Sequence, residues 1–275
     1  MAASSITIGD PGDDPGDDHR GNPPARSSAI SGEMVTDMHA AARRPEERWI
    51  AMMLKAVFWD MDGTLIDSEP YWHAGEMEIA KANGGYWNQE LAWAGSGTPV
   101  PQVAQRMVDH GCQLSVEEIG RGMIDYVARA EAAHMPWIDG VTDVLESLVA
   151  AGIPSVLVTT SPRHLAQGLI DQAPAGAFAG YICGDDDVEK KPSPEPYLAA
   201  ARLLGITPED MRYCAAMEDS MSGLKSAAAS GATTIAQTGY IQTDTSDGPQ
   251  FASISSYDGV TAATLDAFVR SRVGA

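Results

Sequence analysis

Cationic side chains are scarce in this sequence. Its 275 residues contain 18 Lys and Arg against 38 Asp and Glu, which gives a formal net charge of −20. Nucleic acids and anionic membrane surfaces attract proteins through an excess of Lys and Arg. We therefore expect neither a nucleic acid nor a membrane as a partner.

The cysteine and histidine patterns of metal sites are also missing. The three cysteines, Cys112, Cys183 and Cys214, are far apart and form no Cys-x-x-Cys pair, and the six histidines form no His-x-x-x-His pair. Zinc sites are built on such pairs, so none is expected. An odd number of widely spaced cysteines is typical of reduced, buried thiols in a cytosolic protein.

Long apolar runs are absent as well. No window approaches the roughly 18 consecutive apolar residues that a membrane-spanning helix needs. The N-terminal residues show neither the basic region nor the apolar region of a secretory signal. These absences predict a cytoplasmic protein.

The chain is nevertheless long enough to bury a sizeable core. Apolar residues make up 44% of it, which is ordinary for a globular protein. Residues 1–50 differ, because they are rich in Gly, Pro, Asp and Ser and contain a near-repeat of Gly, Asp and Pro at residues 9–18. Such a segment buries too little apolar surface to offset its chain entropy. Residues 1–50 are therefore predicted to be a disordered acidic tail.

From residue 139 onward, helical patterns alternate with short apolar runs. Runs of this kind are typical of buried strands in a parallel sheet whose two faces are covered by helices. The expected strands are 55–59, 154–158, 180–183, 211–216 and 232–236, and the expected helices among them are 139–152, 162–172, 193–205, 219–230 and 262–270. The prediction is an α/β fold, a Rossmann-like core with a parallel five-stranded sheet, built from residues 51–67 and 138–275.

Residues 68–137 interrupt this alternation, and we call them the helical insertion. Ser115 and Glu118 form a capping-box pattern at the start of its last helix. Its tryptophans are expected to pack in its own core or against the rest of the chain. Its helical patterns cover 69–83, 88–93, 99–110 and 115–134, and its tryptophans are Trp72, Trp87, Trp93 and Trp137.

The first strand ends at two carboxylates. Asp60 directly follows the apolar run Ala56–Trp59, and Asp62, Gly63 and Thr64 come next. Ligands bind at the carboxyl ends of strands in open α/β sheets, and two carboxylates so close together favour a cation such as Mg²⁺. By itself, the motif also fits a turn in which Asp side chains cap backbone N–H groups.

Further polar groups follow the later strands, at the same edge of the predicted sheet. They are Thr159, Thr160 and Ser161 after the second strand, Lys190 and Lys191 past the third, and Glu218 and Asp219 after the fourth. Each group alone has a simple structural explanation, such as a helix cap or a solvated loop. Their joint occurrence in this order indicates a site.

The combined set suits chemistry on a phosphoryl group. Asp60 can act as a nucleophile that forms an aspartyl-phosphate, and Asp62 can act as general acid and then as general base. Lys191 supplies a fixed positive charge to the phosphate. Asp219, with Glu218 beside it, completes a Mg²⁺ site. Phosphate binding is assigned to Thr159, Thr160, Gly63 and Thr64.

These motifs resemble those of the haloacid dehalogenase (HAD) superfamily, in the subfamily with a helical cap between the first two motifs. The resemblance implies that Asp60 is phosphorylated and that Asp62 is the acid and base. It also implies that Mg²⁺ binds Asp60, the backbone carbonyl of Asp62 and Asp219, and that the cap closes over a small phosphorylated metabolite. The motifs are residues 58–70, 157–161, 191–197 and 217–223, and the resemblance spans residues 55 to about 239.

Departures from the family pattern narrow the expected activity. Dehalogenases lack the second aspartate, so Asp62 favours phosphoryl transfer. The β-phosphoglucomutase-like members carry a cap-helix histidine where Trp72 stands here and an arginine near Thr98. We therefore expect a Mg²⁺-dependent phosphatase that hydrolyses a small phosphate monoester, such as a sugar phosphate or phosphoglycolate, through an aspartyl-phosphate. Further candidates to line the site are Gly95, Gly97, Arg163 and His164.

Two alternatives remain open at this point. One is a phosphohexomutase of the β-phosphoglucomutase type. The other is a non-catalytic phospho-acceptor like a response-regulator receiver, which also combines an acceptor Asp, a Thr or Ser and a Lys on a parallel sheet. The helical insertion and Asp62 disfavour the receiver, because an acceptor needs no general acid for a leaving group. No sequence pattern indicates an oligomeric state.

Overall fold

A computed structural model describes residues 52–240 and 244–274, and all structural statements below concern these residues. The acidic tail predicted at residues 1–50 lies outside the described residues. Within the described part, no helix is long and apolar enough to cross a membrane.

The core is a parallel sheet with the strand order β3-β2-β1-β4-β5-β6. The α/β prediction is confirmed, but the sheet has six strands, not five. The added edge strand is only three residues long and its middle residue, Ser253, is exposed, so it lacks the apolar run that identified the others. The strands are β1 (Ala56–Trp59), β2 (Ser155–Val158), β3 (Phe178–Ile182), β4 (Cys214–Glu218), β5 (Thr233–Gln237) and β6 (Ala252–Ile254).

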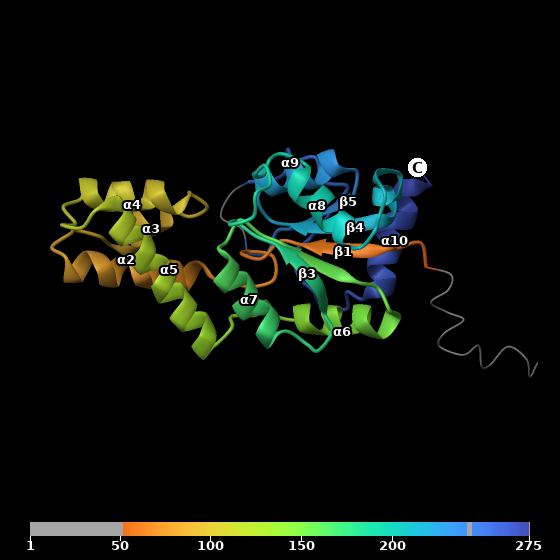
Figure 1. The fold of residues 1–275 in the computed structure, drawn as a ribbon, viewed down its shortest axis with the longest axis horizontal. Coiled ribbons are helices and arrows are strands. Elements are labelled where there is room, and N and C mark those ends of the chain that lie inside the picture. The colour runs from red at the N-terminus through yellow and green to blue at the C-terminus, as the bar shows by residue number, and fades with distance from the viewer. Residues whose placement is uncertain (1–51, 241–243, 275) are drawn as a thin grey trace, which may run out of the picture. The chain divides into compact units, whose positions relative to one another are not determined.

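Side chains of β1 alternate between two hydrophobic clusters, one on each face of the sheet. Ala56 and Phe58 belong to the cluster that includes residues of α8 and α9, whereas Val57 and Trp59 belong to the cluster that includes residues of α6, α7 and α10. Figure 1 shows α8 and α9 on one side of the sheet and α6 on the other. The helices are α6 (Val141–Ala151), α7 (Arg163–Gln172), α8 (Glu195–Leu203), α9 (Met221–Ser230) and α10 (Ala262–Val273).

Several predicted boundaries were wrong for local reasons. The strand predicted at 211–216 begins at Cys214, because Pro208–Tyr213 forms a 3₁₀ helix whose buried Met211 resembles a strand residue in the sequence. Helix α6 starts after Gly140 in a left-handed conformation, so Asp139 is not its N-cap.

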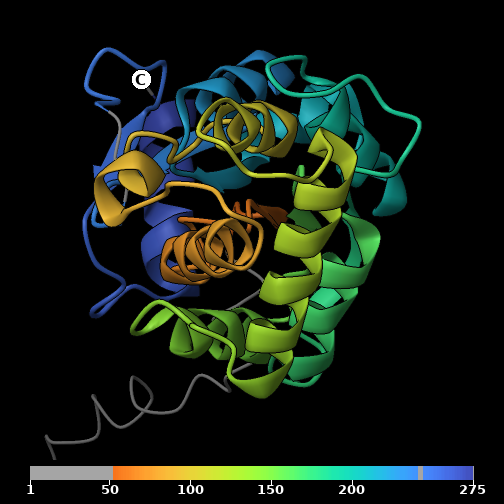
Figure 2. The same cartoon turned by 90° about the vertical axis from the view of Figure 1, so that its left-hand side faces the viewer.

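The helical insertion contains α2 (Glu69–Ala82), α3 (Gln89–Trp93), α4 (Val100–Asp109) and α5 (Val116–Ala133). It has a hydrophobic cluster of its own, and the Ser115–Glu118 capping box is present at the start of α5. Trp72 and Trp87 pack against this cluster, but Trp93 is 40% exposed and contacts the ring of His73. Figure 2 looks onto these helices, with α2 and α5 side by side.

The insertion also contacts the core. The amide of Gln172 on α7 donates to the carbonyl of Glu131 on α5 at 3.1 Å, and Ile66 pairs with Trp137 in an isolated β-bridge. The insertion thus joins the core close to the loop that follows β1. Its role as a cap remains a proposal, which is taken up below.

Candidate active site

Polar side chains from four loops meet at the carboxyl edge of the sheet. Strand β1 lies between β2 and β4, with Trp59 opposite Leu157 on one side and Met217 on the other. The three strands therefore end at one level. Asp60, which follows β1, and Glu218, which ends β4, are brought close to Lys191 in the loop after β3.

Lys191 is the centre of this arrangement. Its Nζ donates to Asp60 Oδ1 at 2.6 Å, to Glu218 Oε1 at 2.6 Å and to the carbonyl of Val158 at 2.9 Å. Burial alone would lower the pKa of Lys191, but the carboxylates of Asp60 and Glu218 reverse this effect and raise it. Lys191 therefore stays cationic, and its charge is held against Asp60.

Asp60 and Asp219 have perturbed carboxyl groups. Burial, and then repulsion by Glu218, raise the pKa of Asp60 to about 7 against the opposing effect of Lys191. Burial, and then repulsion by Asp60, raise the pKa of Asp219 well above its usual range. Three carboxyl groups, those of Asp60, Glu218 and Asp219, therefore share this buried corner with the single ammonium of Lys191.

The carboxylates of this corner suit a hard divalent cation. Oxygen atoms of Asp60, Glu218 and Asp219 lie within 4.8 Å of one another, and carboxylate oxygens are the ligands that Mg²⁺ prefers. Gly63 leaves the space that the Asp219 side chain fills, because a Cβ there would lie 2.2 Å from Asp219 Oδ2. The donor set and the charge imbalance therefore fit Mg²⁺.

Glu218 differs from its neighbours because both its oxygens already have partners. Oε1 accepts from Lys191 and from the hydroxyl of Tyr197 at 2.8 Å, and Oε2 accepts from the hydroxyl and the N–H of Ser220 at 3.2 Å. The side chain is fully buried, and a Cβ at Gly223 would collide with it. These contacts suit a residue that positions Lys191, and they leave Asp219 as the freer metal ligand.

Asp62 is held apart from this cluster. Its Oδ1 accepts from the Ser68 hydroxyl at 2.5 Å, and its Oδ2 accepts from the Ser161 hydroxyl at 2.7 Å. Two hydroxyl donors fix the orientation of the carboxylate without neutralising its charge. Such an arrangement suits a group that gives and takes a proton.

The predicted phosphate-binding residues fall into two groups. Thr159 is buried, with its Oγ1 accepting from the N–H of Ser161 at 2.9 Å, and Thr160 is exposed in the same loop. The N–H of Gly63 donates to the carbonyl of Ile66, and Thr64 is fully buried. Each group thus has one buried residue, Thr159 or Thr64, and one more accessible residue, and phosphate binding by all four stays a prediction.

The other candidates take different positions. Arg163 pairs with Asp186 and Tyr181, whereas His164 lines a cleft described below. Gly95 packs against the guanidinium of Arg106, and Gly97 adopts φ +72° in open space.

Sequence reasoning assigned no role to Ser68, Ser161 or Tyr197. All three lie within the motifs that carry the family resemblance, and this is the sequence feature that could have identified them. Their hydrogen-bond partners, however, lie at Asp62 and Glu218. The contact between Ser161 and Asp62 spans 99 residues of chain and that between Tyr197 and Glu218 spans 21, so local patterns do not predict them.

Comparison with known proteins agrees with this geometry. The family model of the haloacid dehalogenase-like hydrolases matches residues 54–231. The chain is 29% identical over 192 residues to protein CbbY of Rhodobacter capsulatus. This match covers 66% of this chain and 83% of that protein. It is 28% identical over 204 residues to a phosphoglycolate phosphatase of Pseudomonas putida. This match covers 68% of this chain and 70% of that protein.

Solved structures show the same relationship. The crystal structure of CbbY from Rhodobacter sphaeroides in complex with phosphate superposes with a TM-score of 0.64 at 25% identity, and covers 78% of this chain and 99% of that one. The matched family region contains all four loops of the site. This chain is an enzyme of the haloacid dehalogenase-like hydrolase family.

Proposed function

We propose that this enzyme is a Mg²⁺-dependent phosphatase that hydrolyses a small phosphate monoester through an aspartyl-phosphate on Asp60. The observation that carries the proposal is the separation of the two aspartates. Asp60 is bound to Lys191 at 2.6 Å, whereas Asp62 is held only by the hydroxyls of Ser68 and Ser161. One carboxylate is thus placed beside a cation and the other is free to exchange a proton.

The reaction follows from these two environments. An oxygen of Asp60 attacks phosphorus, the bond from phosphorus to the ester oxygen breaks, and the leaving alkoxide takes a proton from Asp62. Asp62 then accepts a proton from water, the water oxygen attacks phosphorus, and the bond to Asp60 breaks to release inorganic phosphate. Asp60 and Asp62 return to their starting states, so atoms and charge balance.

The remaining groups support both steps. Lys191 compensates the charge of Asp60 and of the phosphoryl oxygens, and Glu218 and Tyr197 keep Lys191 in place. Mg²⁺ would be held by Asp60, Asp219 and the carbonyl of Asp62, with Glu218 beside them, and would reduce repulsion between the anionic nucleophile and substrate. Thr159 and Thr160 would contact the phosphate, and the helical insertion would cap the site.

The relatives support the choice of substrate. A phosphatase for phosphoglycolate and a structure with bound phosphate are among them. Membership of a hydrolase family argues against the non-catalytic receiver. Against the phosphohexomutase alternative, the side chain of Trp72 packs in hydrophobic clusters of the insertion and core, so position 72 itself offers no acid or base.

Release of inorganic phosphate from a panel of phosphate esters, with Mg²⁺ and with EDTA, tests this proposal. We expect hydrolysis that EDTA abolishes and added Mg²⁺ restores, and no hydrolysis by Asp60→Asn. Isomerisation of a hexose phosphate without release of phosphate would instead identify a mutase. Full activity in EDTA would contradict the role of the metal.

A further inference from the structure

A tyrosine near the C-terminus donates a hydrogen bond to the loop that follows β1. The hydroxyl of Tyr257 lies 2.8 Å from the carbonyl oxygen of Thr64, across 193 residues of chain. Tyr257 stands between β6 and α10 and is 1% exposed. It also lies beyond residues 54–231, which the family model matches. The contact therefore joins the first motif to a part of the chain to which the four motifs assign no role.

The loop after β1 is compact, and Thr64 is enclosed in it. The carbonyl of Met61 accepts from the N–H of Thr64 at 3.3 Å and from the N–H of Leu65 at 2.8 Å. Thr64 is fully buried, and its Oγ1 has no hydrogen-bond partner among the described residues. Within the described ranges, the hydroxyl of Tyr257 is thus the one hydrogen-bond partner that Thr64 has outside this loop.

The same loop is packed tightly against a proposed metal ligand. Gly63, next to Thr64, has a φ of +77°, and a Cβ added to it would lie 2.2 Å from Asp219 Oδ2. The backbone of Gly63 and the carboxylate of Asp219 are therefore in close contact. The carbonyl of Asp62, the other proposed ligand from this loop, belongs to the residue just before Gly63. A displacement of the loop at Thr64 would change the positions of Asp62 and Asp219 relative to each other.

The ring of Tyr257 is itself held in place. It packs against the ring of Trp59 on β1, with 6.1 Å between the ring centroids. Gly140 makes room for it, because a Cβ there would lie 3.2 Å from the Cβ of Tyr257. The N–H of Val260 donates to the carbonyl of Tyr257 at 3.0 Å. A hydroxyl on a fixed ring keeps its acceptor, the Thr64 carbonyl, at a fixed position.

The hydroxyl of Tyr257 also remains a donor. Burial raises the pKa of Tyr257, an interaction with Gln237 opposes this effect, and the negative charges of Asp219 and Asp60 raise the pKa again. The phenol therefore keeps its proton at neutral pH. Its interaction with both carboxyl groups also places it near the proposed metal ligands.

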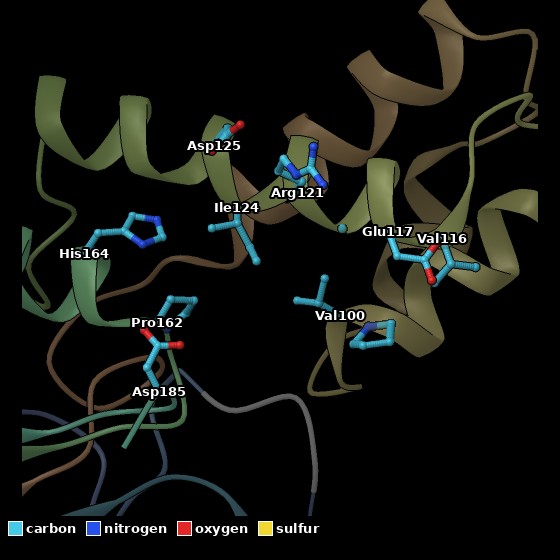
Figure 3. A pocket seen from close by; sticks show the side chains of 11 residues that line it. Val100, Val116, Glu117, Arg121, Ile124, Asp125, Pro162, His164 and Asp185 are labelled. Atoms are coloured by element: carbon cyan, nitrogen blue, oxygen red, sulfur yellow. The ribbon is translucent and has the colours of Figure 1, made fainter. Parts of the chain in front are cut away.

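Tyr257 does not line the cleft between the insertion and the core. This cleft has a volume of about 610 Å³, and its walls include Ile124 of the insertion and Pro162 and His164 of the core (Figure 3). Neither Tyr257 nor Thr64 is among its lining residues. An effect of Tyr257 on the reaction would therefore act through the loop, and not through contact with a ligand held in the cleft.

We propose that Tyr257 is a positioning residue for the metal site of this enzyme. This inference rests on the proposed function, which places Mg²⁺ at Asp60, Asp219 and the carbonyl of Asp62. The hydroxyl of Tyr257 holds the carbonyl of Thr64, and the loop held in this way keeps the Asp62 carbonyl and the Asp219 carboxylate in place for one ion. The C-terminal segment thus acts on the site through the backbone of the loop after β1.

Binding of Mg²⁺ to the substrate-free full chain, measured by isothermal titration calorimetry, tests the proposal with Tyr257→Phe. This variant loses the hydroxyl and keeps the packed ring. Replacing groups that orient metal ligands weakens metal binding by about 10–100-fold, so we expect Kd for Mg²⁺ to rise by at least about fivefold for this indirect contact. In steady-state hydrolysis, the Mg²⁺ concentration that gives half-maximal phosphate release should rise in parallel, and KM for the ester should change by less than about twofold.

Two variants separate positioning from stability. Asp266→Asn alters a contact that the C-terminal segment makes before β1, where Asp266 Oδ1 accepts from the N–H groups of Met53 at 2.6 Å and Leu54 at 2.8 Å. It should lower the melting temperature and leave Kd for Mg²⁺ unchanged. Tyr71→Phe is the matched control, because the hydroxyl of Tyr71 also donates to a backbone carbonyl, that of His134. It should leave Kd for Mg²⁺ unchanged as well.

The outcomes distinguish this proposal from the one on which it rests. If Tyr257→Phe binds Mg²⁺ as tightly as the wild type, Tyr257 does not position the metal site, and the phosphatase function stands. If Asp266→Asn weakens Mg²⁺ binding as much as Tyr257→Phe does, the effect follows stability and the proposal fails. If the wild type neither binds Mg²⁺ nor releases phosphate from any ester, both proposals are overturned.

Discussion

The carboxyl groups of the core and those of the helical insertion are treated differently by the fold. In the core, Asp60 and Glu218 share the ammonium of Lys191, and Glu218 has further donors on both oxygens. In the insertion, Glu76 accepts from the indole of Trp87, and Glu131 Oε1 has no partner among the described residues. The core carboxyl groups thus share a cation, whereas these two carboxyl groups of the insertion have at most a neutral donor.

We expect the carboxyl groups of the core to serve catalysis and those of the insertion to serve substrate selection. Removing one partner of a buried ion pair is costly, because it leaves the other charge buried and unpaired. Carboxyl groups with spare hydrogen-bonding capacity can instead gain their partners from a ligand. We therefore expect changes in the core to abolish turnover and changes in the insertion to alter which substrate is turned over.

The largest effect is expected for Asp60→Asn. An amide at this position cannot form the acyl-phosphate, so kcat should fall by at least about 10⁴-fold. Asp143→Asn, at an exposed position of α6, is the control and should keep full activity. Phosphate release under saturating substrate measures both, and residual activity of Asp60→Asn within tenfold of wild type would exclude Asp60 as the nucleophile.

Lys191→Met should lower both activity and stability. Without the ammonium, Asp60 and Glu218 face each other as buried carboxyls, and the loss of a partner in such a pair costs about 3–5 kcal/mol. Lys225→Met, on the exposed face of α9, is the matched control. Chemical denaturation measures the free energy of unfolding. Equal denaturation midpoints for the two variants would show that the network does not stabilise the fold.

Ser68→Ala and Ser161→Ala should each slow the reaction by about tenfold, the value of one lost hydrogen bond to a charged group. Both remove a donor that orients Asp62. The effect should appear in kcat, with little change in melting temperature. Ser147→Ala is the contrasting control, because its hydroxyl bonds only to backbone groups of α6 and α10 and should affect stability alone.

The smallest expected effect is a pH-dependent stabilisation by Glu131→Gln. Burial, and then repulsion by Asp62, raise the pKa of Glu131 to about 8. The folded wild type therefore holds a proton that the unfolded chain releases above its ordinary pKa, so stability falls as pH rises through this window. The glutamine avoids this loss, and its advantage in melting temperature should grow from pH 5 to pH 8.

Parallel melting curves across the whole pH range would contradict the shift at Glu131. Glu90→Gln, which changes an exposed carboxylate of the same insertion, should give such parallel curves.

The sequence predicted that these polar loops would meet, because the strands of a parallel sheet end at one edge. Asp60, Lys191 and Glu218 follow or end separate apolar runs, and the topology brings them within hydrogen-bond distance. Strand β6 was missed because an edge strand of three residues, of which Ser253 is exposed, has no strong apolar pattern. The contact between Asp62 and Ser161 and the unpartnered oxygen of Glu131 depend on distances across the fold, which no local pattern contains.

The most direct test of the account is to trap the phosphorylated enzyme. The Asp62→Asn variant is mixed with a phosphate ester that the wild type hydrolyses, quenched in acid and digested, and the peptides are analysed by mass spectrometry. We predict one added phosphoryl group on the peptide that contains Asp60, and none when Asp60 is also replaced by Asn. A phosphoryl group on another residue, or hydrolysis by the wild type with no adduct trapped at Asp60, would contradict the account.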